Sequence, residues 1–460
     1  MRRSLGWLVA GLLLTTPVAG AAQSVDALIH GVPAGLASAE PVALSLRDAI
    51  RRGLEQNLGA ILEQQRLKGT ESARLGAMSE LLPHVSASVR KSDQVLSTAA
   101  FGFTLPGLPT LLGPFGLFDA RLFMSAPLFD ARGFGALRSG RAEVRAGEAT
   151  VQDVREAVVL AVGTLYLQAE AGAARVASAR AQVATAETLV QIASDQRAAG
   201  LVAGIDVLQQ QVQLQSAQSR MIAAENEFAK SKLSLARAIG LPAGQQFTLA
   251  DTTTFIPSPP TTIDQAVHEA EMNRADLRAA QARVDAAREA RSAEAAGRLP
   301  TVNLDADIGA IGPSRSTAER TYSVAAVMRV PIFEGGSTRA RIQRAESELH
   351  SREAELADVT AGLRYEVEGA LLDMKAADAG VEVADRARAL SRQQLEQAQD
   401  RFRAGVSTSL ELVKAQETVA AVTEQYIASV YAHAIAKASF IRATGQVERQ
   451  FVALVGGAQQ

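Results

Sequence analysis

The feature that most constrains this chain is an internal duplication. The segment Ala-Pro-Leu-Phe-Asp at residues 126–130 matches Val-Pro-Ile-Phe-Glu at 330–334, and Arg-Ala-Ile-Gly at 237–240 matches Arg-Ala-Thr-Gly at 442–445. The offsets between these pairs are 204 and 205 residues. A period this long excludes solenoids built from short repeats and predicts one unit, nearly 200 residues long, that is used twice.

The duplication also sets the expected domain boundaries. Asn57 matches Asn273, and Pro83 matches Pro300, at offsets of 216 and 217 residues. Because the offset falls to 204 at the next proline, the first copy is 13 residues longer between its two prolines. We predict an N-terminal extension at 23–43, repeat 1 at 44–241, a linker at 242–262, repeat 2 at 263–446 and a C-terminal tail at 447–460.

The first 22 residues have the pattern of a secretion signal. Arg2 and Arg3 precede an apolar run, and small residues follow up to an expected cleavage after Ala21 or Ala22. The chain contains no Cys, and its one Trp, Trp7, lies in this segment. An exported chain without Cys has no disulfide scaffold, no thiolate metal site and no Cys nucleophile.

The remaining composition excludes further classes. The balance of 47 basic and 49 acidic residues argues against a nucleic-acid-binding protein, which normally has a basic excess. The five His residues have no metal-ligand spacing, which indicates surface or interface histidines rather than a zinc site. Phosphate-loop and nucleophile-elbow motifs are also absent from the sequence. We therefore expect no catalytic site, no metal site and no cofactor.

Each repeat has the same predicted order of elements. A first helix ends at a proline, two strands follow, and a long proline-free helix leads to a glycine turn and a return helix. The expected helices are 46–81, 135–199 and 205–239 in the first copy, and 263–298, 337–404 and 410–444 in the second. Small residues repeat in heptads along the long helices, which favours packing against neighbours on two sides.

The strands are predicted from alternation of apolar and polar residues. Between 302 and 310, apolar residues alternate with Asn303, Asp305 and Asp307, and the pattern resumes at 322–330. In the first copy it covers 85–89 and 122–126, with 101–118 as the expected hairpin loop. The alternating aspartates are typical of a wet barrel lumen rather than of acid–base catalysis. Each chain therefore supplies four strands.

These strands and helices require an oligomer. The longest helix-compatible apolar stretch after the signal, 157–167, has 11 residues, whereas a membrane-spanning helix needs about 20. Four amphipathic strands would leave open edges in lipid, where unpaired backbone groups are costly. A ring of several copies closes these edges and also covers the small-residue faces of the long helices.

The combination of these parts resembles the TolC family of outer-membrane efflux proteins over about residues 40–446. The resemblance lies in the signal, the duplicated unit, the Pro-Leu-Phe-Asp and Pro-Ile-Phe-Glu-Gly-Gly entries to the long helices, and the turns at 197–208 and 401–412. The second turn, with Arg-Phe-x-x-Gly before a Leu-Glu-Leu return helix, is the more specific. The first turn departs from the pattern because it lacks the Phe.

The resemblance implies a mainly α fold with membrane β structure. Three copies would form an α-barrel of tandem long hairpins, continuous with a 12-stranded outer-membrane β-barrel to which each chain gives four strands. It also implies a passive exit duct in the outer membrane of a Gram-negative cell that spans into the periplasm. Its implied partners are a periplasmic adaptor, an inner-membrane pump and outer-membrane lipid.

The resemblance assigns site residues at the two turns. Glu411 matches the first acidic gate position, Lys414 replaces a second acid found in some members, and Asp206 is the first-copy equivalent. Pairing of Glu411 with Lys414 would weaken cation selectivity. The alternative is that both acids are solvated first-turn residues that complement helix dipoles. The expected adaptor-docking residues are Gly200, Leu201, Arg401, Phe402, Gly405 and Ser407.

Two questions stay open at this point. A periplasmic adaptor or coiled-coil scaffold without a membrane barrel also has long hairpins, but it would normally show one hairpin flanked by small β-domains. The cargo is undecided among drugs, peptides or proteins of a type I secretion system, and metals. Scarce Met and His make copper or silver the least favoured of these cargoes.

Overall fold

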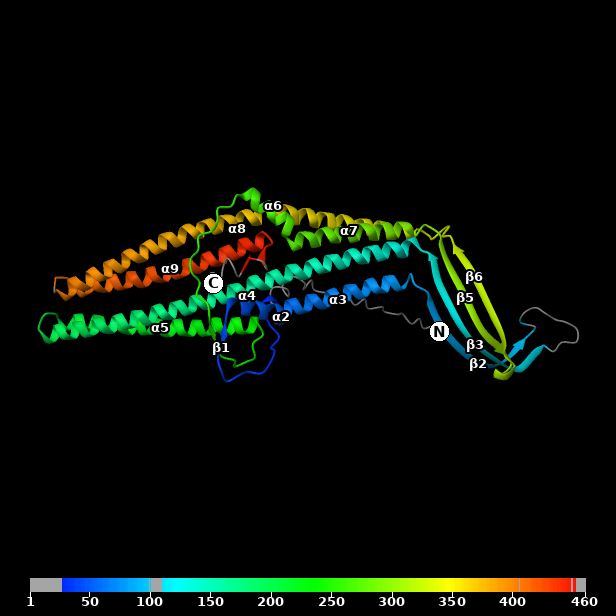
Figure 1. Ribbon diagram of the computed structural model, residues 1–460, viewed down its shortest axis with the longest axis horizontal. Helices are drawn as coiled ribbons and strands as arrows, with labels where there is room; N and C mark the ends of the chain where they lie inside the picture. Colours follow the sequence, from blue (N-terminus) through cyan, green and yellow to red (C-terminus); the bar gives the residue numbers. More distant parts are fainter. Residues whose placement is uncertain (1–26, 99, 101–109, 405, 448–449, 452–460) are drawn as a thin grey trace, which may run out of the picture. The chain divides into compact units, whose positions relative to one another are not determined.

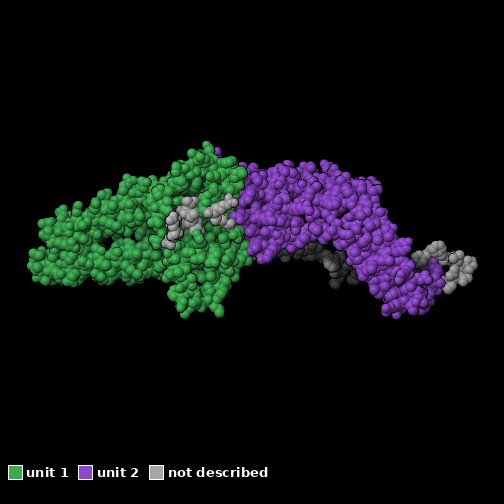
Figure 2. Space-filling model, viewed as in Figure 1, with its two compact units in different colours: residues 1–62, 154–273, 366–460 green, residues 63–153, 274–365 purple. Residues whose placement is uncertain are grey.

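A computed structural model of the chain describes residues 27–98, 100, 110–404, 406–447 and 450–451. The predicted signal at 1–22, and Phe101 and Phe103 of the predicted loop, lie outside these residues. The chain divides into two compact units, coloured in Figure 2. Unit 1 comprises residues 1–62, 154–273 and 366–460, and unit 2 comprises 63–153 and 274–365. Each unit takes segments from both predicted repeats.

Four long helices form two hairpins, as the sequence predicts. In the first repeat α4 covers Ala131–Ala198 and α5 covers Gly204–Ala238; in the second, α8 covers Ser337–Arg403 and α9 covers Ser409–Ala443. Figure 1 shows α5 returning along α4 and α9 returning along α8. Proline-free sequence rich in Ala, Gln, Glu and Arg accounts for their length, because these residues have high helix propensity.

The expected single helices before the strands are wrong, because each is interrupted. The segment 46–81 forms α2 (Leu46–Gln56) and α3 (Leu58–Ser79), and 263–298 forms α6 (Ile263–Asn273) and α7 (Ala275–Ala296). Asn57 has extended backbone angles, φ −68° and ψ 131°. Its Oδ1 accepts a hydrogen bond from the backbone N–H of Gly59 at 2.9 Å. The asparagine therefore ends α2 and caps α3, whose first N–H groups lack helical partners.

Unit 2 contains a four-stranded antiparallel sheet in the order β2-β3-β5-β6. The strands are β2 (His84–Ser97), β3 (Leu111–Phe129), β5 (Thr301–Gly312) and β6 (Glu319–Arg329). All four predicted strands are present and longer than predicted. Residues 111–118, expected to be loop, belong to β3 and pair with β2 and β5. The weak alternation there hid the strand, because Gly and Pro interrupt the pattern.

The sheet has one polar face and one apolar face. On the polar face, Arg121 of β3 forms ion pairs with Asp119 and Asp307, and the Ser125 hydroxyl donates to Asp305 Oδ1 at 2.7 Å. The register places the alternate residues on the other face, where Leu122 pairs with Ile308, and Ile308 with Tyr322. These three side chains are 50%, 59% and 79% exposed. An exposed apolar sheet face of this kind is what a lipid-facing sheet requires.

Unit 1 has its main core where α4, α5 and α9 meet a two-stranded parallel sheet of β1 (Val42–Leu44) and β4 (Phe247–Leu249). The Tyr166 hydroxyl, fully buried on α4, donates to the carbonyl oxygen of Leu44 at 3.0 Å. One turn further along α4, Glu170 accepts a hydrogen bond from the Thr253 hydroxyl. Burial raises the pKa of the Glu170 carboxyl to about 7, and the charge of Asp251 contributes to the rise.

One helix among the described residues, α4, is long and apolar enough to cross a membrane by length and composition alone. Its most apolar window is 56% buried inside the protein. A helix of a protein core satisfies the same test, and the buried side chains of α4 include Val158, Val162 and Leu167. We assign α4 to the core on the basis of this burial.

The hairpin tips as a candidate functional site

The first tip is a helix end closed by glycine. Gly200 has φ +74°, a conformation that glycine adopts without steric cost. The N–H of Leu201 donates to the carbonyl of Gln196 at 2.8 Å, and the N–H of Gly200 donates to that of Arg197 at 3.0 Å. These bonds define a Schellman-type C-cap, which satisfies the last carbonyls of α4. Gly200 therefore has the role of a turn glycine that the sequence predicts for it.

The second tip uses the same device with a stronger N-cap. The Val406 N–H donates to the Arg401 carbonyl at 3.0 Å, five residues back, and the predicted docking residue Gly405 lies outside the described residues. Thr408 caps α9 by accepting from the Glu411 N–H at 3.4 Å. The equivalent N-cap residue of α5 is Ala203, which has no side-chain oxygen.

A small apolar core joins the two tips. Phe402 of α8 is 2% exposed and packs with residues from all four helices: Leu189, Ala193, Val207, Ala398, Leu412 and Ala415. Phe402 was expected among the docking residues, but this burial gives its side chain a packing role. The asymmetry between the turns now has a physical reason, since one phenylalanine fills the space shared by both.

Polar contacts also connect the tips. The Ser409 hydroxyl of α9 donates to Asp206 Oδ1 of α5 at 2.5 Å, and Ser409 is 4% exposed. The Gln196 amide of α4 donates to the Phe402 carbonyl at 3.1 Å. Asp206 Oδ2 in turn accepts from the Ala203 N–H at 3.1 Å, so its carboxylate serves both its own helix and the neighbouring hairpin.

Glu411 has partners within its own hairpin. Its Oε2 accepts from the Ser407 hydroxyl at 2.6 Å, and its Oε1 lies 3.5 Å from Arg401 Nη1. Lys414 is exposed and forms no ion pair with any residue that the structure describes. The predicted gate acids are thus both first-turn residues, but only Asp206 also accepts a hydrogen bond from the other hairpin. Glu411 contacts Arg401 rather than Lys414 in the single chain.

Several tip residues offer exposed surface. Leu201 is 71% exposed and Val406 is 67% exposed, and the Arg401 side chain is 57% exposed. Sequence reasoning selected Leu201, Arg401 and Ser407 but missed Ser409 and Gln196, which carry the contacts between hairpins. The one available signal was the departure from repeat symmetry, because Ser409 replaces Gly204 of the first copy.

One histidine departs from the expected surface position. His433 of α9 is 3% exposed; its Nε2 lies 2.9 Å from Asp378 Oδ1 of α8, and its ring packs edge-on against Phe255. Burial lowers the pKa of His433, although the Asp378 carboxylate opposes this shift. Within the described residues no group of three or more His, Asp or Glu is arranged to hold a metal ion.

A sheet with an exposed apolar face, joined in one chain to duplicated long hairpins, defines a membrane channel subunit. The family described as "Outer membrane efflux protein" matches residues 65–241 and 266–446, and the chain belongs to this family. It is an outer-membrane efflux channel protein that extends into the periplasm. The family and the fold are those of transport channels rather than of enzymes.

The chain is similar to two bacterial proteins in sequence and to a solved channel in structure. Protein CyaE of Bordetella pertussis is 28% identical over 309 residues, which cover 64% of this chain and 63%, less than two thirds, of CyaE. The pyoverdine export outer membrane protein OpmQ of Pseudomonas aeruginosa is 25% identical over 426 residues, 89% of this chain and 88% of OpmQ. The open-state MtrE channel of Neisseria gonorrhoeae has the same fold, with a TM-score of 0.74 at 17% identity, covering 91% of this chain and 95% of that chain.

Proposed function

We propose that the chain assembles as a homotrimer whose 12 strands close one outer-membrane barrel. The observation that carries this proposal is the sheet of unit 2. Its apolar face is exposed, and neither β2 nor β6 has a second strand partner among the described residues. In lipid such edges must pair, because unpaired N–H and C=O groups are costly there. Four strands from each of three copies give a closed barrel of even strand number.

Exposed apolar stripes on the long helices support the same assembly. On α5, Ile205, Leu208 and Val212 follow helical spacing and are 59%, 56% and 62% exposed. On α8, Leu372, Val383 and Leu390 are 61%, 63% and 66% exposed. Exposed apolar stripes on a monomer are typical of interaction surfaces. Lateral packing of neighbouring copies would cover them and form the α-barrel wall.

The assembled protein would act as a passive exit duct. The tips would form its periplasmic entrance, where the exposed side chains of Leu201, Arg401 and Ser407, together with Gly200 and Gly405, would contact an adaptor linked to an inner-membrane pump. Glu411, Lys414 and Asp206 would ring the constriction. Two observations favour a gate here: the tips are held by few polar contacts, and these contacts join two hairpins that must separate for a wider opening.

Among the open cargo classes, the comparisons favour a small organic molecule. OpmQ, the relative aligned over 426 residues, is a pyoverdine export protein. Protein secretion by a type I system and metal export are the alternatives. Deletion of the gene followed by measurement of exported metabolites would separate them, because only small-molecule export predicts a metabolite retained in the periplasm.

Conductance in planar lipid bilayers tests the duct directly. Purified full-length protein should insert and give discrete conductance steps. A boiled sample of the same protein, which has lost its assembly, is the control. The periplasmic scaffold alternative predicts no insertion and no steps from either sample, and that outcome would overturn the proposal.

A further inference from the structure

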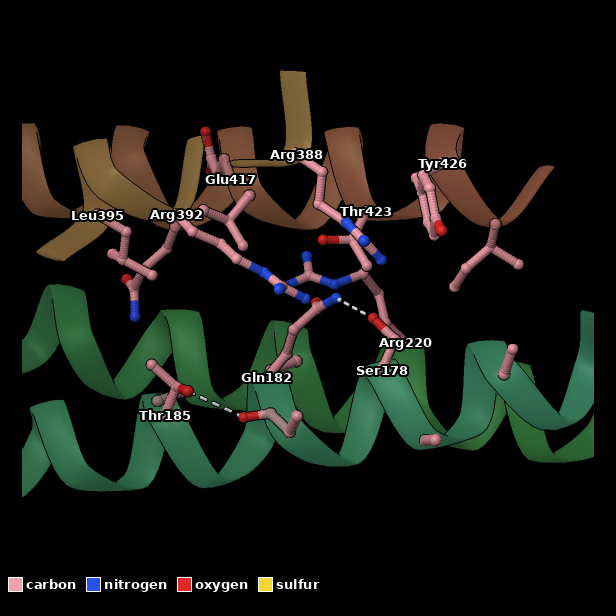
Figure 3. Close-up of a pocket in the computed structure, with 18 of the residues that line it drawn as sticks. Ser178, Gln182, Thr185, Arg220, Arg388, Arg392, Leu395, Glu417, Thr423 and Tyr426 are labelled. Atoms are coloured by element: carbon pink, nitrogen blue, oxygen red, sulfur yellow. Dashed lines mark hydrogen bonds between the residues drawn. The ribbon is translucent and has the colours of Figure 1, made fainter. Parts of the chain in front are cut away.

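A cavity of about 470 Å³ lies within unit 1 between the helix pairs α4–α5 and α8–α9. Small-molecule sites typically have volumes of about 300–1,000 Å³. All four helices contribute small or apolar lining residues: Ala181, Ala217, Leu395, Val419 and Ile427 among others. Figure 3 shows these helices enclosing the space from two sides. The cavity adjoins the tip core around Phe402, because Leu395 lines the cavity and also packs against that core.

Three arginines supply the charge of this cavity. Arg220 comes from α5, and Arg388 and Arg392 come from α8, one turn apart. Figure 3 shows the three side chains extending into the space between the helix pairs. Among the described lining residues the single acid is Glu417 of α9. Its Oε1 accepts from the Gln213 amide at 3.4 Å. The described lining therefore has an excess of two positive charges.

The arginines differ in how their charges are compensated. Arg388 lies 2.7 Å from Asp385 and stacks over the Tyr426 ring at 3.5 Å. Arg220 and Arg392 form no ion pair with any described residue. Neighbouring arginines on α4 are paired, Arg175 with Glu424 at 2.7 Å and Arg180 with Glu225 at 2.9 Å. The lining of this cavity therefore brings together two exposed guanidinium groups that no carboxylate of the described residues pairs at ion-pair distance.

We propose that this cavity binds an organic anion with an apolar body. The guanidinium groups of Arg220 and Arg392 would hold a carboxylate or sulfonate by charge-assisted hydrogen bonds, which are the strong ones in proteins. The alanine and leucine lining would cover the apolar part. Because the ligand would contact both hairpins, it would bind to the wall of the channel rather than to the tip.

The test measures binding to the full-length protein in nanodiscs of zwitterionic lipid, with lipid-only nanodiscs subtracted. The probe is 2-naphthoate, compared with its neutral analogue 2-naphthalenemethanol and with acetate, in equilibrium dialysis. We expect 2-naphthoate to bind and both comparison compounds to bind at least about tenfold more weakly. Equal binding of the neutral analogue would overturn the role of charge, and equal binding of acetate would overturn the role of the apolar lining.

Variants locate the site. Arg220→Gln combined with Arg392→Gln should weaken 2-naphthoate binding at least about tenfold. The matched control, Arg180→Gln with Arg386→Gln, removes two positive charges from paired arginines outside the cavity and should bind as the wild type does. Ala181→Trp should abolish binding by filling the space without changing charge.

The proposal is overturned if the double variant binds like the wild type. It is also overturned if the assembled protein does not bind 2-naphthoate, which is the outcome expected if an acidic side chain of a second copy occupies the cavity. The binding measurement uses no conductance readout. A failure of the ligand proposal can therefore be distinguished from a failure of the proposed duct.

Discussion

The hydroxyl of Ser409 on α9 donates a hydrogen bond to the carboxylate of Asp206 on α5, at 2.5 Å. The two residues are 203 positions apart and belong to different repeats. The reciprocal contact does not form, because Gly204 stands where the second repeat has Ser409 and offers no hydroxyl to Glu411. The duplicated tips are thus joined by asymmetric polar contacts, this bond and the one from the Gln196 amide to the Phe402 carbonyl, in addition to the shared core at Phe402.

Loss of this bond should loosen the tips locally. Ser409→Ala leaves the Asp206 carboxylate without its partner across the hairpins, and a hydrogen bond to a charged group is worth about 1.5–3 kcal/mol. We expect faster amide hydrogen exchange at residues 201–208 and unchanged exchange in the sheet. Ser407→Ala, which removes a contact within one hairpin, is the control. A double-mutant cycle with Asp206→Ala that gives strictly additive effects would contradict the coupling.

Glu411 tests the proposed gate. Glu411→Gln removes one negative charge per chain while keeping an oxygen that can accept from Ser407. If Glu411 rings the constriction, the pore should lose cation preference, because charged rings set ion selectivity. Reversal potentials in a salt gradient measure this change. Glu396→Gln, an exposed acid on α8, should leave selectivity unchanged. The same reversal potential in wild type and Glu411→Gln would remove this residue from the constriction.

The exposed face of the sheet tests the membrane assignment. Ile308→Arg places a charge on the apolar face, where an arginine costs about 2–4 kcal/mol at the middle of a bilayer. The control is Ser323→Arg. Ser323 follows Tyr322 in β6 and therefore lies on the opposite, polar face, where it pairs with Asp307. We expect lower yields of folded protein in lipid vesicles for Ile308→Arg alone, read from gel mobility of unheated samples. Similar yields for both variants would argue against a lipid-facing sheet.

Glu170 predicts a pH dependence of stability. Its folded-state pKa of about 7 lies above its ordinary value of 4.5, because burial disfavours the charged form. The folded state therefore binds more protons than the unfolded state between these values. The contribution of Glu170 to the free energy of unfolding is fully present below pH 4.5 and is lost as the pH rises through 7. The loss amounts to about 3 kcal/mol for this group.

Glu170→Gln should remove this dependence. The glutamine oxygen can still accept from Thr253, and no proton needs to be lost. We expect the apparent Tm of the variant to exceed that of the wild type at pH 8 and to differ little at pH 4.5. Glu187→Gln on the exposed surface of α4 is the control. An equal difference in apparent Tm at both pH values would contradict the shifted pKa.

Most of the fold could be predicted from the sequence because its signals are local. Prolines, glycine turns and long proline-free runs place the ends of α4, α5, α8 and α9 within a few residues. The alternation at 302–310 identified β5 together with its polar and apolar faces. The break at Asn57 was missed because an asparagine changes helix propensity little. The match of Asn57 with Asn273 was a usable signal of that break.

The candidate site was predicted less completely because its contacts are not local. The Ser409–Asp206 bond and the packing of Phe402 depend on how two hairpins meet, which no spacing within either hairpin specifies. His433 is buried because the segment 250–262 covers it, and Ser258 and Phe255 of that segment contact its ring. The sequence identified this segment as a linker, which gave no indication that its residues bury a histidine.

The central claim is that three copies close one channel, and the mass of the assembled protein tests it most directly. Light scattering of the purified mature protein, with the detergent contribution subtracted, should give three times the mass of one mature chain. Circular dichroism of that sample should contain a β contribution. A monomer or dimer under the conditions that support conductance would contradict the account, because four or eight of these strands cannot provide the 12-stranded wall that the trimer predicts.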